Sequence, residues 1–431
     1  MSILRTMYTG SAGLRAHSEA LGVTGDNIAN ANTVGFKRSR AVFEDALGRS
    51  IAGASAIATA GAGSRLAHVQ QMWTQGALLT TDAPTDLAIS GNGLFMVNGN
   101  VDGVDGRFYT RAGQFHLDSD GFLVNPDNLR LQGYQADSTG ALSATVGDLQ
   151  VGSGTIPAVP TANVLMTANL DANAVTPTLP WDPADPGGTS NYSTTTTVYD
   201  SLGAAHDMTV YFRKTGAGAW DWHAMVDGAE ITGGTPGVPT EGASGSMTFT
   251  TDGALATSTT AASSWDFVGA TPGQAIAFDF GTSIAAGGTG LTGSTQFATP
   301  SSVASLSQDG YAAGQVSAIA VEGDGTVTGI FGNGQRRTLG QVAVADFASV
   351  DGLGRAGHNL WTETQASGDP LVGAAGSGGR GSLVSGALEG SNVDLGSEFV
   401  DLIAYQRGFS ATSKVITTAD EMYQELVNLK R

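Results

Sequence analysis

The sequence contains no cysteine. Disulfide bonds, thiol catalysis and cysteine-ligated metals are therefore excluded. No stretch approaches the roughly 18 consecutive apolar residues of a membrane-spanning helix, so we expect no membrane insertion. Near the N-terminus, Gly10, Ser11 and Arg15 interrupt the apolar core that a cleaved signal peptide needs. If the protein leaves the cell, we expect its own N-terminal segment to serve as the export signal.

Basic residues are also scarce, with 20 Lys and Arg against 39 Asp and Glu and a net charge of −19. Proteins bind phosphate backbones with clustered Lys and Arg, so nucleic acid is not expected as a partner. The one basic cluster, at Lys37, Arg38 and Arg40, lies beside Glu44 and Asp45. We predict that this cluster keeps the segment soluble rather than forming a binding patch.

The sequence contains no complete motif for a metal site, a calcium loop or a nucleotide-binding site. The six histidines never lie three or four residues apart, which argues against a His-based metal site. The aspartates between Asp102 and Asp120 lack the spacing of a calcium loop and predict hairpin turns. The glycine pattern from Gly352 to Gly357 is not followed by a helical segment, so it predicts a strand-connecting turn and not a nucleotide site. We therefore predict no enzymatic activity, catalytic residue, cofactor or metal.

Both ends of the chain carry apolar residues at seven-residue spacing, and almost nothing between them does. Seven residues are close to two helical turns, so each series marks one side of a helix. The spacing predicts one helix from residue 3 to about 30 and another from about 393 to the end. The two series are Met7, Leu14, Leu21 and Ile28, and then Leu395, Leu402, Phe409, Ile416 and Tyr423.

A helical apolar stripe most often packs on the core of its own domain. Here both stripes are terminal, and the sequence predicts no third helix to complete a bundle. The charges of the C-terminal helix lie off its seven-residue line, at Glu398, Asp401, Arg407 and Lys414. These features favour mutual or intermolecular coiled-coil packing. The predicted self-assembly surface comprises the two series together with Asn27, Asn30, Asn32, Phe399 and Leu426.

The middle of the chain has the period of two that is typical of strands, from Leu87 onward, with turns rich in Gly, Asn and Asp. Residues 36 to about 75 fit either one helical turn or an extended stretch, residues 51–63 fit a loop, and residues 368–381 fit a glycine-rich linker. A length of 431 residues predicts several domains. We predict a multidomain α+β protein in which the terminal helices pair as an α-helical coiled coil, with two β-rich domains in the middle. The predicted parts are 1–35 with 382–431 (terminal helices), 36–85 with 365–381 (connecting region), 86–150 with 299–364 (β-rich core), and 151–298 (inserted outer β domain).

Four segments resemble a known family. Residues 11–14 followed by 26–37 (DNIANANTVGFK) resemble the N-terminal signature of bacterial flagellar rod and hook proteins, which usually have Asn in place of Asp26. Residues 84–95 (PTDLAISGNGLF) and 109–115 (YTRAGQF) resemble the first β segments of the shared core domain, and residues 385–394 (SGALEGSNVD) resemble the C-terminal signature. The length, the insert and residues 293–298 and 307–314 are similar to hook members of the family rather than to distal-rod members.

The resemblance implies a structural subunit that is exported through the flagellar type III apparatus and polymerises into a curved, hollow tube. This tube would be a universal joint that transmits torque from rod to filament outside the cell. The implied partners are other copies of the chain, the distal rod, the hook cap, the hook-length control and hook–filament junction proteins, and the export apparatus. Two alternatives remain open at this point: a distal-rod protein, or an acidic extracellular β-rich enzyme or adhesin.

Overall fold

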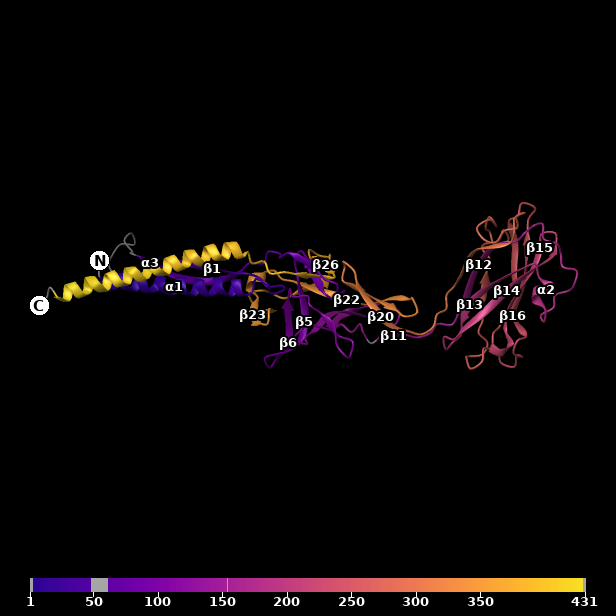
Figure 1. The fold of residues 1–431 in the computed structure, drawn as a ribbon, viewed down its shortest axis with the longest axis horizontal. Helices are drawn as coiled ribbons and strands as arrows, with labels where there is room; N and C mark the ends of the chain where they lie inside the picture. The colour runs from indigo at the N-terminus through magenta and orange to yellow at the C-terminus, as the bar shows by residue number, and fades with distance from the viewer. Residues whose placement is uncertain (1–2, 48–60, 153, 429–431) are drawn as a thin grey trace. The chain divides into compact units, whose positions relative to one another are not determined.

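The computed structural model describes residues 3–47, 61–152 and 154–428 (Figure 1). The chain divides into two compact units. The first unit comprises Met1–Gly154, Val316–Ile330 and Arg336–Arg431, and the second comprises Thr155–Gln315 and Phe331–Gln335. The boundary predicted at residue 299 falls within the second unit, because β19 (Ser302–Gln308) pairs there with β12 (Asn163–Asn169).

Two long helices, α1 (Ile3–Ala29) and α3 (Leu395–Asn428), lie side by side in the first unit (Figure 1). This confirms the prediction of one helix at each end of a mainly β-rich chain. Gly10 lies opposite Ile416, and Asn27 lies opposite Glu398, so the two helices are antiparallel. None of the described helices is long and apolar enough to cross a membrane.

The buried face of α1 consists of small side chains. A Cβ atom placed on Gly10 would lie 2.8 Å from Ile416 Cγ1, and one placed on Gly13 would lie 3.2 Å from Thr412 Cγ2. Small residues therefore let the two helices approach closely, whereas the predicted series is only half-buried beside this face. The buried residues are Gly10, Gly13, Ala16, Ala20, Thr24 and Asn27; the half-buried ones are Met7, Leu14, Leu21 and Ile28.

A β-hairpin packs against α1. It consists of β1 (Ser39–Leu47) and β2 (Gly61–Gln71), which pair antiparallel and are also joined by an ion pair between Arg65 and Glu44. The segment that the sequence left open between helical turn and extended chain is therefore extended. Most of the loop predicted over residues 51–63 lies outside the described residues.

The β part of the first unit is a large array of short strands that pair antiparallel. The main sheet has the order β20-β21-β22-β9-β5-β6-β24-β23, and two smaller pairs are β4–β26 and β3–β27. The segment predicted as a linker over residues 368–381 contains β25, which pairs with β22, so that prediction was wrong. The bounds are β3 (Leu78–Thr80), β4 (Leu87–Ser90), β5 (Leu94–Val101), β6 (Val104–Thr110), β7 (His116–Leu117), β8 (Leu123–Val124), β9 (Arg130–Ala136), β10 (Leu142–Asp148), β20 (Gly314–Val321), β21 (Thr326–Phe331), β22 (Arg336–Asp346), β23 (Gly354–Gly357), β24 (Leu360–Thr362), β25 (Leu371–Ala374), β26 (Ser382–Ser385) and β27 (Ala387–Glu389).

The second unit is built on a five-stranded antiparallel sheet and a three-stranded sheet. Trp220 and Trp222 are fully buried in its aromatic core, whereas Asp221 between them is not. This alternation is the one expected for a strand with one exposed face. The larger sheet contains β13 (Tyr192–Tyr199), β14 (Ala205–Gly216), β15 (Ala219–Asp227), β16 (Pro239–Phe249) and β17 (Leu255–Ser263). The smaller sheet contains β18 (Ala277–Asp279), β12 and β19. The unit also contains the short strand β11 (Thr155–Ile156) and the single-turn helix α2 (Pro186–Thr189).

Candidate assembly interface

Helix α3 exposes large apolar side chains along its length. Leu402, Phe409 and Ile416 of the predicted series are half-buried, whereas Leu395 and Tyr423 are exposed, as is Phe399. The side chain of Leu426 lies outside the described residues. A surface this apolar on one helix is typical of an interaction site. The exposed set, between 45% and 67% accessible, is Leu395, Phe399, Val400, Ile403, Val415, Met422, Tyr423 and Val427.

A groove of about 480 Å³ lies where the start of α1 meets the second half of α3. Val415, Ala419 and Met422 supply most of its apolar wall, and Thr6 closes it on the α1 side. Val415 and Met422 also belong to the exposed set of α3.

A polar contact sets the register of the two helices at the other end of the pair. Asn27, which is 1% exposed, donates through Nδ2 to Ser39 O at 2.7 Å and to Glu398 Oε2 at 3.0 Å, and its Oδ1 accepts from Ser39 N at 2.8 Å. Glu398 lies off the predicted apolar line but is only 2% exposed, and Arg38 Nε lies 3.5 Å from its Oε1. A buried polar pair of this kind favours one register over its neighbours.

The other two asparagines of the predicted surface have different roles. Asn30 stabilises the end of α1, since its Nδ2 donates to Asp26 O at 2.9 Å and its Oδ1 accepts from Thr33 Oγ1 at 3.0 Å. Asn32 is exposed. Gly35 then turns the chain with φ +68°, and a Cβ there would lie 2.5 Å from Ala112 N. Glycine is required at this position by both conformation and space.

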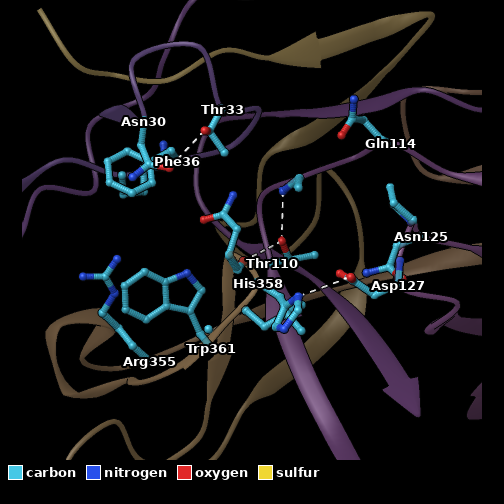
Figure 2. Close-up of a pocket in the computed structure, with 16 residues that line it drawn as sticks. Asn30, Thr33, Phe36, Thr110, Gln114, Asn125, Asp127, Arg355, His358 and Trp361 are labelled. Atoms are coloured by element: carbon cyan, nitrogen blue, oxygen red, sulfur yellow. Dashed lines mark hydrogen bonds and ion pairs between the residues drawn. The ribbon is translucent and has the colours of Figure 1, made fainter. Parts of the chain in front are cut away.

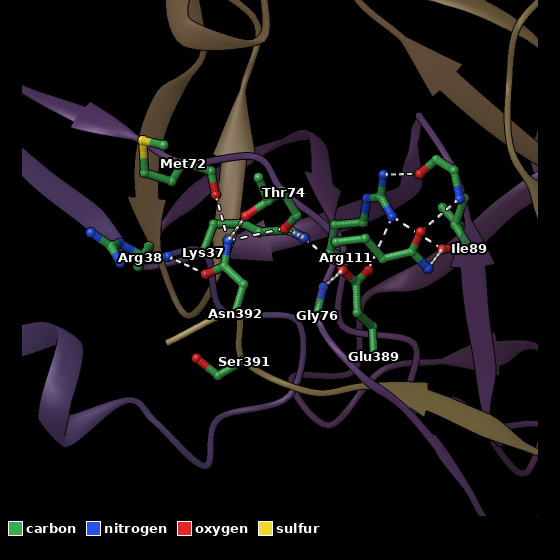
Figure 3. Close-up of polar contacts among 12 residues, drawn as sticks. Lys37, Arg38, Met72, Thr74, Gly76, Ile89, Arg111, Glu389, Ser391 and Asn392 are labelled. Atoms are coloured by element: carbon green, nitrogen blue, oxygen red, sulfur yellow. Dashed lines mark hydrogen bonds and ion pairs between the residues drawn. The ribbon is translucent and has the colours of Figure 1, made fainter. Parts of the chain in front are cut away.

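A buried ion cluster, formed by Lys37, Arg111 and Glu389, lies between the helices and the β strands (Figure 3). Glu389 is fully buried and accepts from Lys37 Nζ at 2.6 Å, from Arg111 Nη1 at 3.0 Å and from the backbone N–H of Gly76 at 2.9 Å. Lys37 is only 1% exposed and also donates to Thr74 O. The prediction that Lys37 keeps its segment soluble was therefore wrong.

The Glu389 cluster holds two cations and one carboxylate. Burial lowers the pKa of Lys37 below its usual range, and the nearby Arg111 lowers it further, whereas Glu389 acts in the opposite direction. Because its members come from the exit of α1, the β core and the approach to α3, the cluster joins three segments that are far apart in sequence. Asn392 reinforces the junction by donating to Met72 O at 2.7 Å and accepting from Arg38 N at 2.7 Å (Figure 3).

A pocket of about 470 Å³ lies beside this junction, under the hairpin of β23 and β24 (Figure 2). His358 and Asn359 have φ of +51° and +60°, as a two-residue hairpin turn requires. The turn predicted for Gly352 to Gly357 is therefore displaced, because Gly354–Gly357 form β23 and the turn follows them. The turn is held in place because Asn359 Nδ2 donates to Val34 O at 2.8 Å and His358 Nδ1 lies 3.3 Å from Asp127 Oδ1. Within the part of the chain that the structure describes, no group of three His, Asp or Glu side chains is arranged to hold a metal.

Sequence reasoning missed Glu389, Arg111 and Asn392 as interacting residues. For Glu389 and Arg111 a signal was available, because each is a charged residue inside one of the family-like segments, where the surrounding residues are mostly small or apolar. A charged residue that interrupts such a segment, without a neighbouring charge to make a solvated run, is a candidate for a buried ion pair.

Models of flagellar protein families match most of the chain. The family described as flagella basal body rod protein matches residues 7–37, and the flagellar hook protein FlgE/F/G D1 domain matches residues 88–171. The flagellar basal body protein FlaE D2 domain matches residues 169–311, and the flagellar basal body rod FlgEFG protein C-terminal family matches residues 384–429. The matches to both ends and to the β regions agree with the resemblance seen in the sequence motifs.

Curated relatives extend over the full length of the chain. The flagellar hook protein FlgE of Borreliella burgdorferi is 35% identical and covers 99% of this chain and 100% of its own length. The flagellar hook protein FlgE of Salmonella typhimurium is 36% identical over 97% of this chain and 98% of its own. The crystal structure of Helicobacter pylori flagellar hook protein FlgE2 covers 71% of this chain and 98% of its own, with a TM-score of 0.48 and 16% identity. On the identity and coverage of the curated relatives, the chain belongs to the flagellar hook protein FlgE family.

Proposed function

We propose that the chain is the structural subunit of a bacterial flagellar hook, which polymerises into a curved, hollow tube and works as a universal joint between rod and filament. The observation that carries this proposal is the exposed apolar face of α3, which remains uncovered although α3 already packs against α1. Membership of the hook protein family supports the same conclusion. An apolar face of this kind gains stability when a neighbouring copy covers it.

The antiparallel pair of α1 and α3 gives this interface a direction. The groove at Val415 and Met422 lies at one end of the pair, and the exposed Phe399 and Ile403 lie toward the other. Contacts between two different patches join the copies head to tail, and they extend into an open helical assembly when the rotation between neighbours does not close a ring. We propose that the two helices act as a coiled-coil element in the polymer.

We also propose that the parts of the chain form concentric layers of the tube. The terminal helices would form the inner wall, the β-rich core the middle layer and the insert the outer surface. The inner wall would comprise α1 and α3, the middle layer the β strands of the first unit, and the outer surface the second unit, Thr155–Gln315 with Phe331–Gln335. Export through the flagellar type III system would bring the subunit outside the cell, where it would meet the distal rod, the hook cap, the hook-length control proteins and the hook–filament junction proteins.

Assembly can be tested by changing the exposed face of α3 alone. A triple variant, Phe399→Gln, Ile403→Gln and Val415→Gln, changes only side chains that are at least 46% exposed, so the isolated chain should keep its fold. We expect this variant to lose polymer formation in sedimentation and electron microscopy, while its far-UV circular dichroism stays unchanged. A Gln406→Ala variant on the same helix is the matched control, because Gln406 is exposed but polar. Wild-type-like polymerisation of the triple variant would contradict the proposal.

Two deletions separate the remaining alternatives. Removing residues 1–30 and 395–431 should abolish polymerisation and leave the β strands folded, whereas an enzyme or adhesin would keep its activity. Removing Thr155–Gln315, the longer segment of the second unit, should alter the curvature of the polymer and impair swimming if this unit forms the outer surface of a joint. A wild-type polymer that stayed straight under every solution condition would favour a distal-rod subunit instead.

A further inference from the structure

Three Asn-Gly pairs occur in the sequence, at Asn92–Gly93, Asn98–Gly99 and Asn333–Gly334. In such a pair the backbone nitrogen of Gly attacks Cγ of the preceding Asn side chain. A bond forms between this nitrogen and Cγ, the Cγ–Nδ2 bond breaks, and Nδ2 leaves as ammonia with the proton of the attacking N–H. Water then opens the resulting succinimide ring to aspartate or isoaspartate. Glycine favours the attack because it has no Cβ to obstruct the approach.

The Asn92–Gly93 pair lies in the loop between β4 and β5. Asn92 is exposed, and among the residues that the structure describes none forms a hydrogen bond with its side-chain amide or with Gly93 N. Glycine is required at position 93, because Gly93 has φ +116° and a Cβ there would lie 2.4 Å from Val344 Cγ1. The attacking nitrogen and the amide that it attacks are therefore both unrestrained by hydrogen bonds.

Asn333 is the matched comparison, because it lies in the same tripeptide, Gly-Asn-Gly, as Asn92. Its side chain is held, since Asn333 Nδ2 donates to Ala312 O at 2.6 Å. The attacking nitrogen is held as well, since Gly334 N donates to Phe331 O at 2.9 Å. Attack at Asn333 therefore requires two hydrogen bonds to open first.

The third pair, Asn98–Gly99, lies inside β5. Asn98 pairs with Arg107 of β6 on one side and with Arg130 of β9 on the other. Ring closure draws the Gly nitrogen toward the Asn side chain, so it twists the backbone out of the extended conformation. A strand held between two neighbours opens rarely, and we expect Asn98 to keep its amide.

We propose that Asn92 is a site of spontaneous deamidation in the folded protein, and that its conversion to aspartate and isoaspartate is faster than that of Asn98 and Asn333. Exposure alone does not make this distinction, because Asn98 is exposed as well. The distinction comes from the hydrogen bonds and strand pairing that hold the other two pairs. The inference concerns the single chain and is independent of the proposed function.

Conversion of Asn92 to isoaspartate should loosen the pairing of β4 with β26. Isoaspartate routes the main chain through the former side chain and adds one carbon atom to the loop. In the unmodified chain, Asn92 O accepts from Gly381 N at 2.7 Å, directly before β26. The neighbouring Gly91 O accepts from Arg111 Nη2 at 2.6 Å. A longer loop displaces these acceptors, and deamidation also adds a negative charge to a cavity that Asp346 already lines.

Peptide mapping of the wild-type chain tests the assignment without any variant. The full-length chain is incubated at mildly alkaline pH, and mass spectrometry follows the exchange of the amide NH2 for OH in the peptides that contain the three Asn residues. We expect Asn92 to convert at least about tenfold faster than Asn333, because two hydrogen bonds must open first at Asn333. In urea the two Gly-Asn-Gly sites should convert at similar rates. Conversion of Asn98 or Asn333 as fast as that of Asn92 in the folded chain would overturn the inference.

An Asn92→Gln variant tests the structural consequence, because its longer side chain closes a larger and less favourable ring. Before incubation its melting temperature should equal that of the wild type, since the Asn92 amide has no hydrogen bond to lose. After incubation, hydrogen exchange of Ser382–Ser385 in β26 should be faster in the wild type than in the variant. Equal exchange in a wild-type sample with complete conversion at Asn92 would overturn the proposed loosening. A wild-type chain that converts as expected but never polymerises would overturn only the proposed function.

Discussion

Replacing Glu389 should destabilise the first unit far more than replacing Lys37, although the two side chains form one ion pair. The reason is the imbalance of charge in the Glu389 cluster, in which Lys37 and Arg111 share a single carboxylate. Glu389→Gln keeps the shape of the side chain and leaves two buried cations without a counter-ion. Lys37→Met removes one cation and leaves Arg111 and Glu389 as a balanced pair.

The expected costs follow from what each change leaves unpaired. Breaking a buried ion pair by removing one partner costs about 3–5 kcal/mol, and Glu389→Gln also weakens the bond from Gly76 N. Lys37→Met loses the bonds to Thr74 O and Glu389 but also relieves the burial of a charge, so we expect about 1 kcal/mol. Against a stability of about 5–15 kcal/mol for a typical domain, only the first change approaches unfolding of the unit.

Urea denaturation followed by hydrogen exchange measures this difference. Peptides of the first unit report the free energy of unfolding, and peptides of the second unit are an internal reference that neither variant should change.

The difference in stability between the wild type and Lys37→Met should also depend on pH. Because the pKa of Lys37 is lowered in the folded state, the unfolded chain binds more protons in the alkaline range. The wild type should therefore gain stability relative to Lys37→Met as the pH rises toward the ordinary lysine pKa of about 10.4. Equal costs for the two variants at neutral pH would refute the charge-imbalance reasoning.

Two further predictions use single substitutions. Gly408→Ala should destabilise the helix pair, because the new Cβ would lie 2.7 Å from His17 Cε1. Gly22→Ala should instead stabilise α1 by about 0.5–1 kcal/mol, because a Cβ at Gly22 would meet nothing within 4 Å. Melting temperatures that shift in the same direction for both variants would contradict this prediction. In the second unit, burial opposes ionisation of Asp200, but hydrogen bonds from Ala204 N, the His206 ring and Leu202 N outweigh it and lower its pKa. That stabilisation is present above the unfolded-state pKa and is lost as the pH falls below about 4, so an Asp200→Asn variant should show a flatter acid denaturation curve than the wild type.

The elements that the sequence predicted well are those with local signals. Both long helices follow from their periodicity, and the alternation of buried and exposed residues in β15 follows from its period of two. The strand β25 could not be recognised, because Leu371–Ala374 is short, lies among glycines and is defined by its pairing with β22. The hairpin of β1 and β2 was ambiguous for the same reason, since its pairing and its packing on α1 are tertiary properties.

The site was less predictable than the fold because its contacts are distant in sequence. Lys37 and Glu389 are separated by 352 positions, and a local pattern assigns each of them to a solvated surface. The apolar residues at seven-residue spacing predicted that α1 makes its contacts through large side chains, whereas α1 contacts α3 through Gly10 and Gly13. Close helix packing selects small residues, and these carry no hydrophobic signal in the sequence.

This use of small residues explains why α3 keeps so much apolar surface exposed. A narrow contact with Gly10 and Gly13 covers only one side of α3, so Phe399 and Ile403 remain available on the rest of the helix. The Asn27–Glu398 contact and the Glu389 cluster meanwhile hold α3 in one register and one direction. A surface held in place before association loses less conformational entropy when a neighbouring copy covers it. The same polar contacts that stabilise the first unit therefore also prepare its apolar helix face for assembly.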